Sequence, residues 1–172
     1  MTATRRAGLD LISHSSDQTR ELGTALSRKL QPGDLVLLSG GLGSGKTTFI
    51  QGIASGLEVD EIVSSPTFTL IAEYAGRVSG DLVRLYHIDL YRLAGDPDEL
   101  YSAGLEEHFE DPDAICAVEW PQRAPDLLPD TWLLVELESI ADTKRRVRLI
   151  ARGDRYDELV TAIRAEAGRG RG

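Results

Sequence analysis

Asparagine is absent from the 172-residue sequence, and cysteine and methionine occur once each. Without asparagine the chain cannot carry N-K-x-D, the motif with which classical GTPases read guanine. No aspartate has a glycine three positions later, so the D-x-x-G motif of the same proteins is missing as well. The single cysteine, Cys116, cannot form an internal disulfide, which suits a reducing compartment. The missing motifs disfavour a classical GTPase. The single cysteine is compatible with a protein of the cytosol.

Long apolar runs and basic residues are also scarce. Hydrophobic residues make up 41% of the chain, but no uninterrupted apolar stretch approaches the ~20 residues that a membrane-spanning helix needs. Residues 1–6 contain arginines but are not followed by a long apolar segment, so a secretory signal is not expected. The formal net charge of −9 argues against broad, charge-driven binding to nucleic acid. We therefore predict a cytoplasmic protein, and the length fits one domain.

One stretch carries a complete phosphate-binding pattern. Gly40 and Gly45 bracket four residues, and Lys46 and Thr47 follow, which completes G-x-x-x-x-G-K-[ST]. The glycines let backbone N–H groups converge on phosphate oxygens, and the helix that follows adds positive charge at its N-terminus. The pattern predicts that Lys46 reaches the β- and γ-phosphates and that the Thr47 hydroxyl holds Mg²⁺.

The flanking residues agree with this pattern. The apolar run at 35–38 predicts the strand that leads into the loop. Residues 48–55 predict the helix that follows, and Gly56 is expected to end it. A strand before the loop and a helix after it are the context that a phosphate-binding loop requires.

Upstream of the loop, apolar residues at helical spacing predict a first helix with Ser16 as its N-cap. Its first turn contains Asp17 and Thr19, which we consider as contacts for the adenine or ribose of a nucleotide. A packing helix with exposed polar residues is the alternative interpretation. Residues 1–14 are assigned to an N-terminal extension that precedes the domain.

Two carboxylates follow predicted strands. Asp89 ends the β-rich run 82–89, and Glu119 follows the apolar run 114–118. A carboxylate at a strand end can hold Mg²⁺ or position the attacking water. The sequence leaves open which of the two acids takes which role. His87 shares a strand face with Asp89 and is interpreted as a structural or supporting residue.

A hydroxyl-rich segment lies between the loop helix and these strands. Pro66 fixes the backbone, and Thr67 and Thr69 follow it. A threonine in this position can sense the γ-phosphate and the metal, so we predict a switch around Thr67. An ordinary loop that leads into a strand explains the same pattern. Just before it, residues 61–63 suggest a short strand.

The C-terminal third is predicted to contain two antiparallel strands, 131–138 and 145–151, and an amphipathic helix at 154–166. Arg146 lies in the densest basic group of the chain and is considered as a nucleotide contact. Solvated charge on an edge strand would explain this basic group as well. The domain is accordingly assigned to residues 15–166, and residues 167–172 to a disordered tail.

Four motifs follow one another in a set order along the chain. They are Gly40-x-Leu42-Gly43-x-Gly45-Lys46-Thr47-Thr48-Phe49, Ser65-Pro66-Thr67-Phe68-Thr69-Leu70, His87-Ile88-Asp89-Leu90-Tyr91-Arg92-Leu93 and Glu119-Trp120-Pro121. Together they resemble the bacterial TsaE (YjeE) family, over about residues 15 to 150. The sequence departs from the family at Gly41, where an aspartate is usual.

The resemblance implies a compact α/β domain with a central mixed sheet flanked by helices, which binds ATP and Mg²⁺ and hydrolyses ATP weakly when alone. It implies TsaB and TsaD as partners, which modify adenosine 37 of tRNA, and a hydrolysis step that resets their complex between turnovers. The residues assigned to the nucleotide are Gly41, Leu42, Gly43, Ser44, Gly45, Lys46, Thr47, Thr48, Thr19 and Arg146. Those assigned to catalysis are Lys46, Thr67, Asp89 and Glu119. Those assigned to the metal are Thr47, Asp89 and Glu119.

Two other functions remain compatible with the residues. A phosphotransferase that acts on a small metabolite would share the phosphate-binding loop, although the chain shows no convincing Arg-rich lid. A regulatory module that binds ATP without hydrolysing it would share the loop as well.

Overall fold

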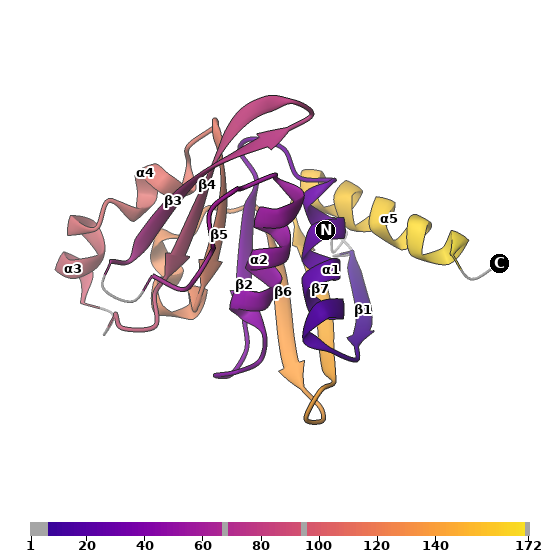
Figure 1. Ribbon diagram of the computed structural model, residues 1–172. Coiled ribbons are helices and arrows are strands. Elements are labelled where there is room, and N and C mark those ends of the chain that lie inside the picture. Colours follow the sequence, from indigo (N-terminus) through magenta and orange to yellow (C-terminus); the bar gives the residue numbers. More distant parts are fainter. Residues whose placement is uncertain (1–6, 67–68, 94–95, 171–172) are drawn as a thin grey trace, which may run out of the picture.

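A β-sheet forms the centre of the computed structural model, which describes residues 7–66, 69–93 and 96–170 (Figure 1). Within these ranges the sheet has seven strands in the order β1-β7-β6-β2-β5-β4-β3. Their bounds are β1 Gly8–Ser13, β2 Leu35–Ser39, β3 Ile71–Val78, β4 Asp81–Asp89, β5 Ala114–Glu119, β6 Trp132–Ser139 and β7 Arg145–Arg152. Strands β6, β2, β5 and β4 run parallel, and every pairing that involves β1, β7 or β3 is antiparallel. The predicted α/β fold with a mixed sheet is confirmed.

Helices lie on both faces of this sheet. Their bounds are α1 Ser16–Ser27, α2 Lys46–Gly56, α3 Pro97–Ser102, α4 Leu105–Phe109 and α5 Asp154–Arg169, with 3₁₀ turns η1 Pro121–Arg123 and η2 Pro125–Leu127. Buried side chains of α1, α2 and α5 share one core cluster, and those of α3 and α4 share a second one on the other face. None of the helices in the described ranges is long and apolar enough to cross a membrane.

The strand that leads into the loop is buried on both sides. Val36 and Leu38 belong to the core cluster under α1, α2 and α5, whereas Leu35 and Leu37 belong to the cluster under α3 and α4. Side chains of a strand alternate between faces, so a continuous apolar run is what a covered parallel strand needs. This double burial anchors the start of the loop.

Glycines allow α1 and α2 to pack backbone against backbone. A Cβ on Gly52 would lie 2.9 Å from the carbonyl carbon of Arg20 and closer still to its oxygen. A Cβ on Gly56 would overlap the Ser27 side chain and lie 3.1 Å from the Thr24 carbonyl oxygen. Gly56 was expected just outside the helix as its stop, but it is the last helical residue of α2 and Leu57 is the C-cap. Close approach of the two helices accounts for this glycine.

The predicted N-terminal extension belongs in part to the sheet. β1 pairs with β7 from Gly8 opposite Ile150 to Ser13 opposite Arg145. The prediction missed β1 because an edge strand with polar residues carries a weak apolar signal. The N-cap of α1 is Ser15 and not Ser16, since the Ser15 hydroxyl accepts a hydrogen bond from the Gln18 N–H at 3.1 Å.

Other boundaries also differ from the prediction. Helix α2 begins at Lys46, two residues before the predicted start, because Gly45 serves as its N-cap. Residues 61–63 do not form the short strand that was predicted, and the side chain of Ile62 is exposed. Helix α5 continues to Arg169, so residues 167–169, which were assigned to a disordered tail, are helical.

Candidate nucleotide-binding site

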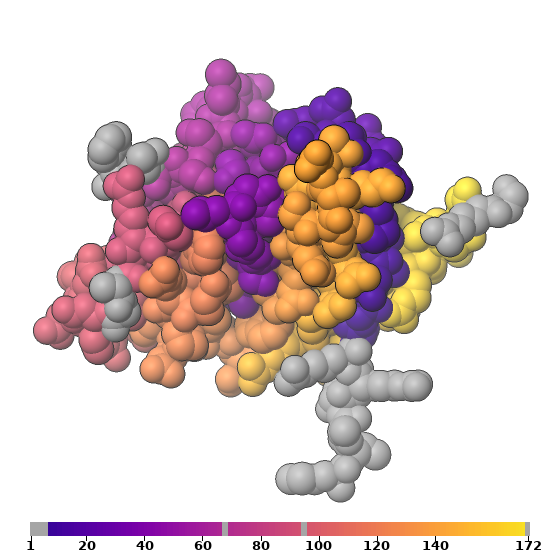
Figure 2. Space-filling view, turned by 90° about the horizontal axis from the view of Figure 1, so that it is seen from below, coloured from indigo at the N-terminus to yellow at the C-terminus, as the bar shows by residue number. Residues whose placement is uncertain are grey.

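The candidate site lies where the parallel strands β2, β5 and β4 end side by side. β2 leads into the glycine-rich loop, and β4 and β5 end at Asp89 and Glu119, which face each other in register. Ligands of open parallel sheets bind outside the carboxyl ends of the strands. Figure 2 looks onto this end of the molecule, with the purple loop between the orange β6–β7 turn and the segments that follow β4 and β5.

Backbone geometry explains the glycines of the loop. At Gly40, φ is 150°, and a Cβ there would lie 3.1 Å from the Ser44 Cβ. Gly43 and Gly45 have φ values of 73° and 102°, which other residues rarely adopt. Gly45 begins α2 without a side-chain cap, so the N–H groups of the first turn stay available. The loop thus offers backbone donors and the positive end of a helix to an anion.

The Lys46 ammonium folds back over the loop. Nζ donates hydrogen bonds to the carbonyl oxygens of Gly40 and Gly41, each at 2.8 Å. It also lies 4.4 Å from the centre of the Trp120 ring, a cation–π distance. Burial lowers the pKa of Lys46, and the carboxylates of Glu119 and Asp89 oppose that shift. The ammonium is therefore held within reach of any anion in the loop.

A hydrogen-bonded network joins the first turn of α2 to the end of β5. The Thr47 hydroxyl lies 3.1 Å from Glu119 Oε1 and 2.7 Å from the Ser65 hydroxyl. Ser65 donates to Glu119 Oε2 at 3.1 Å, and His87 Nε2 lies 2.7 Å from the same oxygen. Glu119 is 3% exposed and His87 is fully buried. The carboxylate is thus fixed from three sides.

The two strand-end acids have opposite pKa shifts. Burial alone would raise the pKa of Glu119, but hydrogen bonds from His87, Ser65 and Thr47 outweigh it and lower the pKa. Burial raises the pKa of Asp89, and the hydrogen bond from the Tyr91 N–H only partly offsets this. Glu119 is therefore the more readily ionised acid, and Asp89 the better proton acceptor.

The oxygens of Thr47 and Glu119 form a donor set that fits Mg²⁺. This ion prefers oxygen ligands and commonly takes one or two carboxylates together with phosphates and water. The described residues contain no group of three His, Cys, Asp or Glu side chains arranged to hold a metal. The arrangement therefore suits an ion that phosphate oxygens help to coordinate.

The glycine-rich loop and the network around Glu119 lie within the span of one protein family. The family of threonylcarbamoyl adenosine biosynthesis protein TsaE matches residues 13–147. The chain belongs to the TsaE family. Two curated relatives carry the name tRNA threonylcarbamoyladenosine biosynthesis protein TsaE. The Bacillus subtilis protein is 36% identical over 83% of this chain and 85% of its own, and a Nostoc protein is 44% identical over 70% and 72%.

A solved TsaE-like structure has the same fold. The crystal structure of Bacillus subtilis YdiB matches with a TM-score of 0.79 and 30% sequence identity. The match covers 96% of this chain and 99% of that one. The sheet and its helices are therefore similar to those of YdiB along almost the whole chain.

Most of the site residues predicted from the sequence lie around one pocket of about 280 Å³. It is lined by Leu42, Gly43, Ser44, Gly45, Lys46, Thr47, Thr48, Ser65, Asp89, Tyr91, Glu119 and Trp120. Gly41 contributes its carbonyl oxygen to Lys46. Thr67, the predicted switch residue, lies outside the described residues. Sequence reasoning missed Ser65 as a partner of Thr47, although it quoted Ser65 within a family motif.

The two predicted nucleotide contacts outside the loop lie in different places. Thr19 is 2% exposed, and its hydroxyl is engaged with Ser13 at 2.7 Å and with the Ser15 carbonyl at 3.2 Å. It lies under Gly45, where its methyl carbon would contact a Cβ at 3.5 Å. Thr19 therefore packs under the loop, and it also lines a cavity of about 180 Å³ with Gly43, Gly45 and Thr48, so its contact with a nucleotide stays a prediction.

Arg146 lies away from the 280 Å³ pocket. It pairs with Glu138 at 3.6 Å on the exposed side of β6 and β7. The neighbouring Arg145 instead reaches the Gly43 carbonyl oxygen at 3.2 Å. The assignment of Arg146 to the nucleotide stays a prediction, and the arginine that reaches the loop is Arg145.

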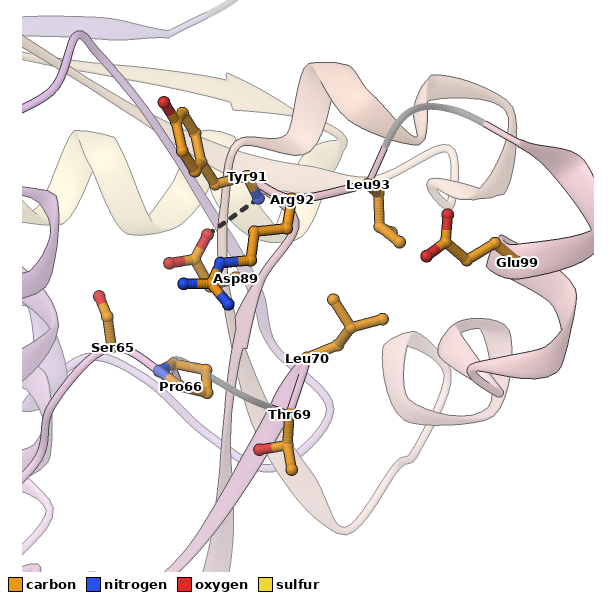
Figure 3. Close-up of a pocket in the computed structure, with 9 residues that line it drawn as sticks. All are labelled: Ser65, Pro66, Thr69, Leu70, Asp89, Tyr91, Arg92, Leu93 and Glu99. Atoms are coloured by element: carbon orange, nitrogen blue, oxygen red, sulfur yellow. Dashed lines mark hydrogen bonds between the residues drawn. The ribbon is translucent and has the colours of Figure 1, made fainter.

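A second pocket of about 360 Å³ adjoins the first (Figure 3). Ser65, Asp89 and Tyr91 line both pockets. The remaining walls are Pro66, Thr69, Leu70, Arg92, Leu93 and Glu99. The dashed line in the figure marks the 3.0 Å hydrogen bond from the Tyr91 N–H to the Asp89 carboxylate. A small polar ligand could lie here beside the phosphate loop.

Proposed function

We propose that the chain is an Mg²⁺-dependent ATPase that acts in the cytoplasm and supports tRNA threonylcarbamoyladenosine biosynthesis. The observation that carries the proposal is the meeting of Lys46, Thr47 and Glu119 at the glycine-rich loop. Membership of the TsaE family and the names of its curated relatives support the pathway. The missing GTPase motifs support ATP as the nucleotide.

The chain's own residues would divide the work as follows. Lys46 would exchange its contacts with the loop carbonyls for oxygens of the β- and γ-phosphates. Thr47 and Glu119 would hold Mg²⁺, which supplies charge neutralisation at the phosphates when bound. Asp89, with its raised pKa, would orient the attacking water and accept its proton. Water adds to the γ-phosphorus as the bond to the β-phosphate oxygen breaks, which releases ADP and phosphate.

We further propose that hydrolysis serves a complex of TsaB and TsaD. In this proposal the chain is a slow ATPase alone, its partners accelerate it, and hydrolysis resets their complex between modifications of adenosine 37 of tRNA. The net charge of −9 supports indirect contact with tRNA, because RNA binding generally needs a basic surface.

A metabolite phosphotransferase is the alternative. The 360 Å³ pocket favours it, since an acceptor placed there would lie beside Asp89 and next to the phosphate loop. In that case the γ-phosphate would leave on the acceptor, and little free phosphate would form.

Phosphate release separates these proposals. It is measured for the purified chain with and without the TsaB–TsaD pair. Lys46→Ala should lower turnover by about 10²-fold or more, and Glu119→Gln should lose the Mg²⁺-dependent turnover. Glu138→Gln is a surface control that should match the wild type. Turnover that ignores the partners would contradict the assembly role. ADP formed together with a phosphorylated metabolite would favour the alternative.

A further inference from the structure

We propose that His87 is a positioning residue for Glu119, which holds one carboxylate oxygen so that the other faces Thr47. The inference rests on the proposed function, because it names the side chain that prepares the Mg²⁺-binding carboxylate. His87 itself contacts neither phosphate nor metal in this proposal.

The contacts divide the two oxygens of the carboxylate. His87 Nε2 and the Ser65 hydroxyl both approach Oε2, at 2.7 and 3.1 Å. Oε1 is the oxygen nearer to Thr47, at 3.1 Å from its hydroxyl. Two donors on Oε2 restrict rotation of the carboxylate about its last bond. Oε1 is thereby presented to the first turn of α2, where Thr47 offers the second metal-binding oxygen.

The register of β4 against its neighbouring strands places the His87 ring within reach of Glu119. His87 on β4 is opposite Ala117 on β5, two residues before the pair formed by Asp89 and Glu119. His87 and Glu119 therefore share a face of the sheet and lie on a diagonal. The neighbour on the other side, in β3, is Ala72. Alanines on both flanks leave space for a ring that reaches along the sheet toward the strand end.

Packing alone does not account for a histidine at this position. The ring is fully buried, and Nδ1 has no hydrogen-bond partner within the described part of the chain. Burial of an unpartnered polar nitrogen costs free energy that an apolar side chain would avoid. Nε2 must carry the proton, since a carboxylate oxygen accepts it. Among the described residues, the one hydrogen bond of the ring is thus directed at the buried carboxylate of the network.

Two amide replacements separate positioning from packing. In His87→Gln the side-chain nitrogen lies as many bonds from the backbone as Nε2, so it can donate to Glu119. In His87→Asn the amide nitrogen lies only as many bonds from the backbone as Nδ1, so it cannot reach Glu119. Binding of a fluorescent ATP analogue and ATP turnover are measured against Mg²⁺ concentration in the full-length chain. His87→Asn should raise the half-maximal Mg²⁺ concentration by roughly 10- to 100-fold, and His87→Gln should stay near the wild type.

Tyr86→Phe is the stability control. Tyr86 precedes His87 on β4, belongs to the opposite core cluster and donates to Asp111 at 2.8 Å. Its loss should lower the melting temperature without changing the Mg²⁺ dependence. If His87→Asn and His87→Gln both lower the melting temperature but show the same Mg²⁺ dependence as each other, His87 contributes only packing and the inference is overturned. A wild type whose ATP binding ignores Mg²⁺ would contradict the proposed function, and this inference with it.

Discussion

Replacing Gly52 with alanine should push α2 away from α1. Gly52 lies in the middle of α2, and an added Cβ would lie 2.9 Å from the carbonyl carbon and 3.1 Å from the Cα of Arg20. Backbone atoms cannot rotate out of the way as a side chain can, so a helix must move. Gly168 offers a matched control. It is also helical, in α5, but no atom lies within 4 Å of a Cβ built there.

The two substitutions should have opposite signs. Alanine is favoured over glycine in a helix by roughly 0.5–1 kcal/mol, which is the whole effect expected for Gly168→Ala. Overpacking costs about 1–3 kcal/mol, and contact between two backbones belongs at the upper end of that range. The net loss for Gly52→Ala is then about 2 kcal/mol. For a chain of this size that corresponds to a melting temperature lower by about 4–8 °C.

Thermal unfolding of the two variants and the wild type is the assay, with binding of a fluorescent ATP analogue measured alongside. Because Lys46 and Thr47 occupy the first turn of α2, Gly52→Ala should weaken ATP binding, whereas Gly168→Ala should leave it unchanged. A Gly52→Ala protein whose melting temperature equals or exceeds that of the wild type would behave as helix propensity alone predicts. That result would refute the close packing of α1 and α2.

Two further predictions concern the site. Binding of ATP should change the fluorescence of Trp120, because Lys46 lies 4.4 Å from its ring and is expected to move to the phosphates. Trp120→Phe should abolish the fluorescence change. Trp132→Phe should keep it, since Trp132 begins β6 at the far end of the parallel strands. An unchanged signal in the wild type would contradict the movement of Lys46. The lowered folded-state pKa of Glu119 contributes stability that is present above its ordinary value of 4.5 and is lost as the pH falls through the lowered pKa. Urea unfolding from about pH 6 to about pH 3 should therefore show a shallower acid limb in Glu119→Gln, and an equally steep limb would contradict this.

The phosphate-binding loop could be predicted from the sequence because its geometry is local. Gly40, Gly43 and Gly45 adopt positive φ angles that other residues rarely take, and Lys46 follows them directly in the chain. The flanking strand was predictable for a related reason. A strand covered on both faces must be apolar at every position, which the run at 35–38 satisfies.

The partners of Glu119 depend on the order of the strands. Glu119 and Thr47 are 72 residues apart in the chain and meet because β5 lies beside β2. The sequence predicted Asp89 and Glu119 as strand ends that lie close together, and the register of β4 against β5 confirms this pairing. The sequence did not show that His87 would reach Glu119, since that contact needs the register of β4 against β5.

Helix packing likewise had to come from the tertiary structure. By itself the sequence determined the phosphate-binding loop, the apolar strands and the family, because these depend on residue types in short stretches and on motifs in a set order. It did not show that Gly56, at the end of α2, must be small because α1 packs against it. It also favoured Arg146 over Arg145, since only the pairing of β7 places Arg145 beside the loop. Contacts between distant segments were decided by the fold, because they exist only once strand order and helix crossing are set.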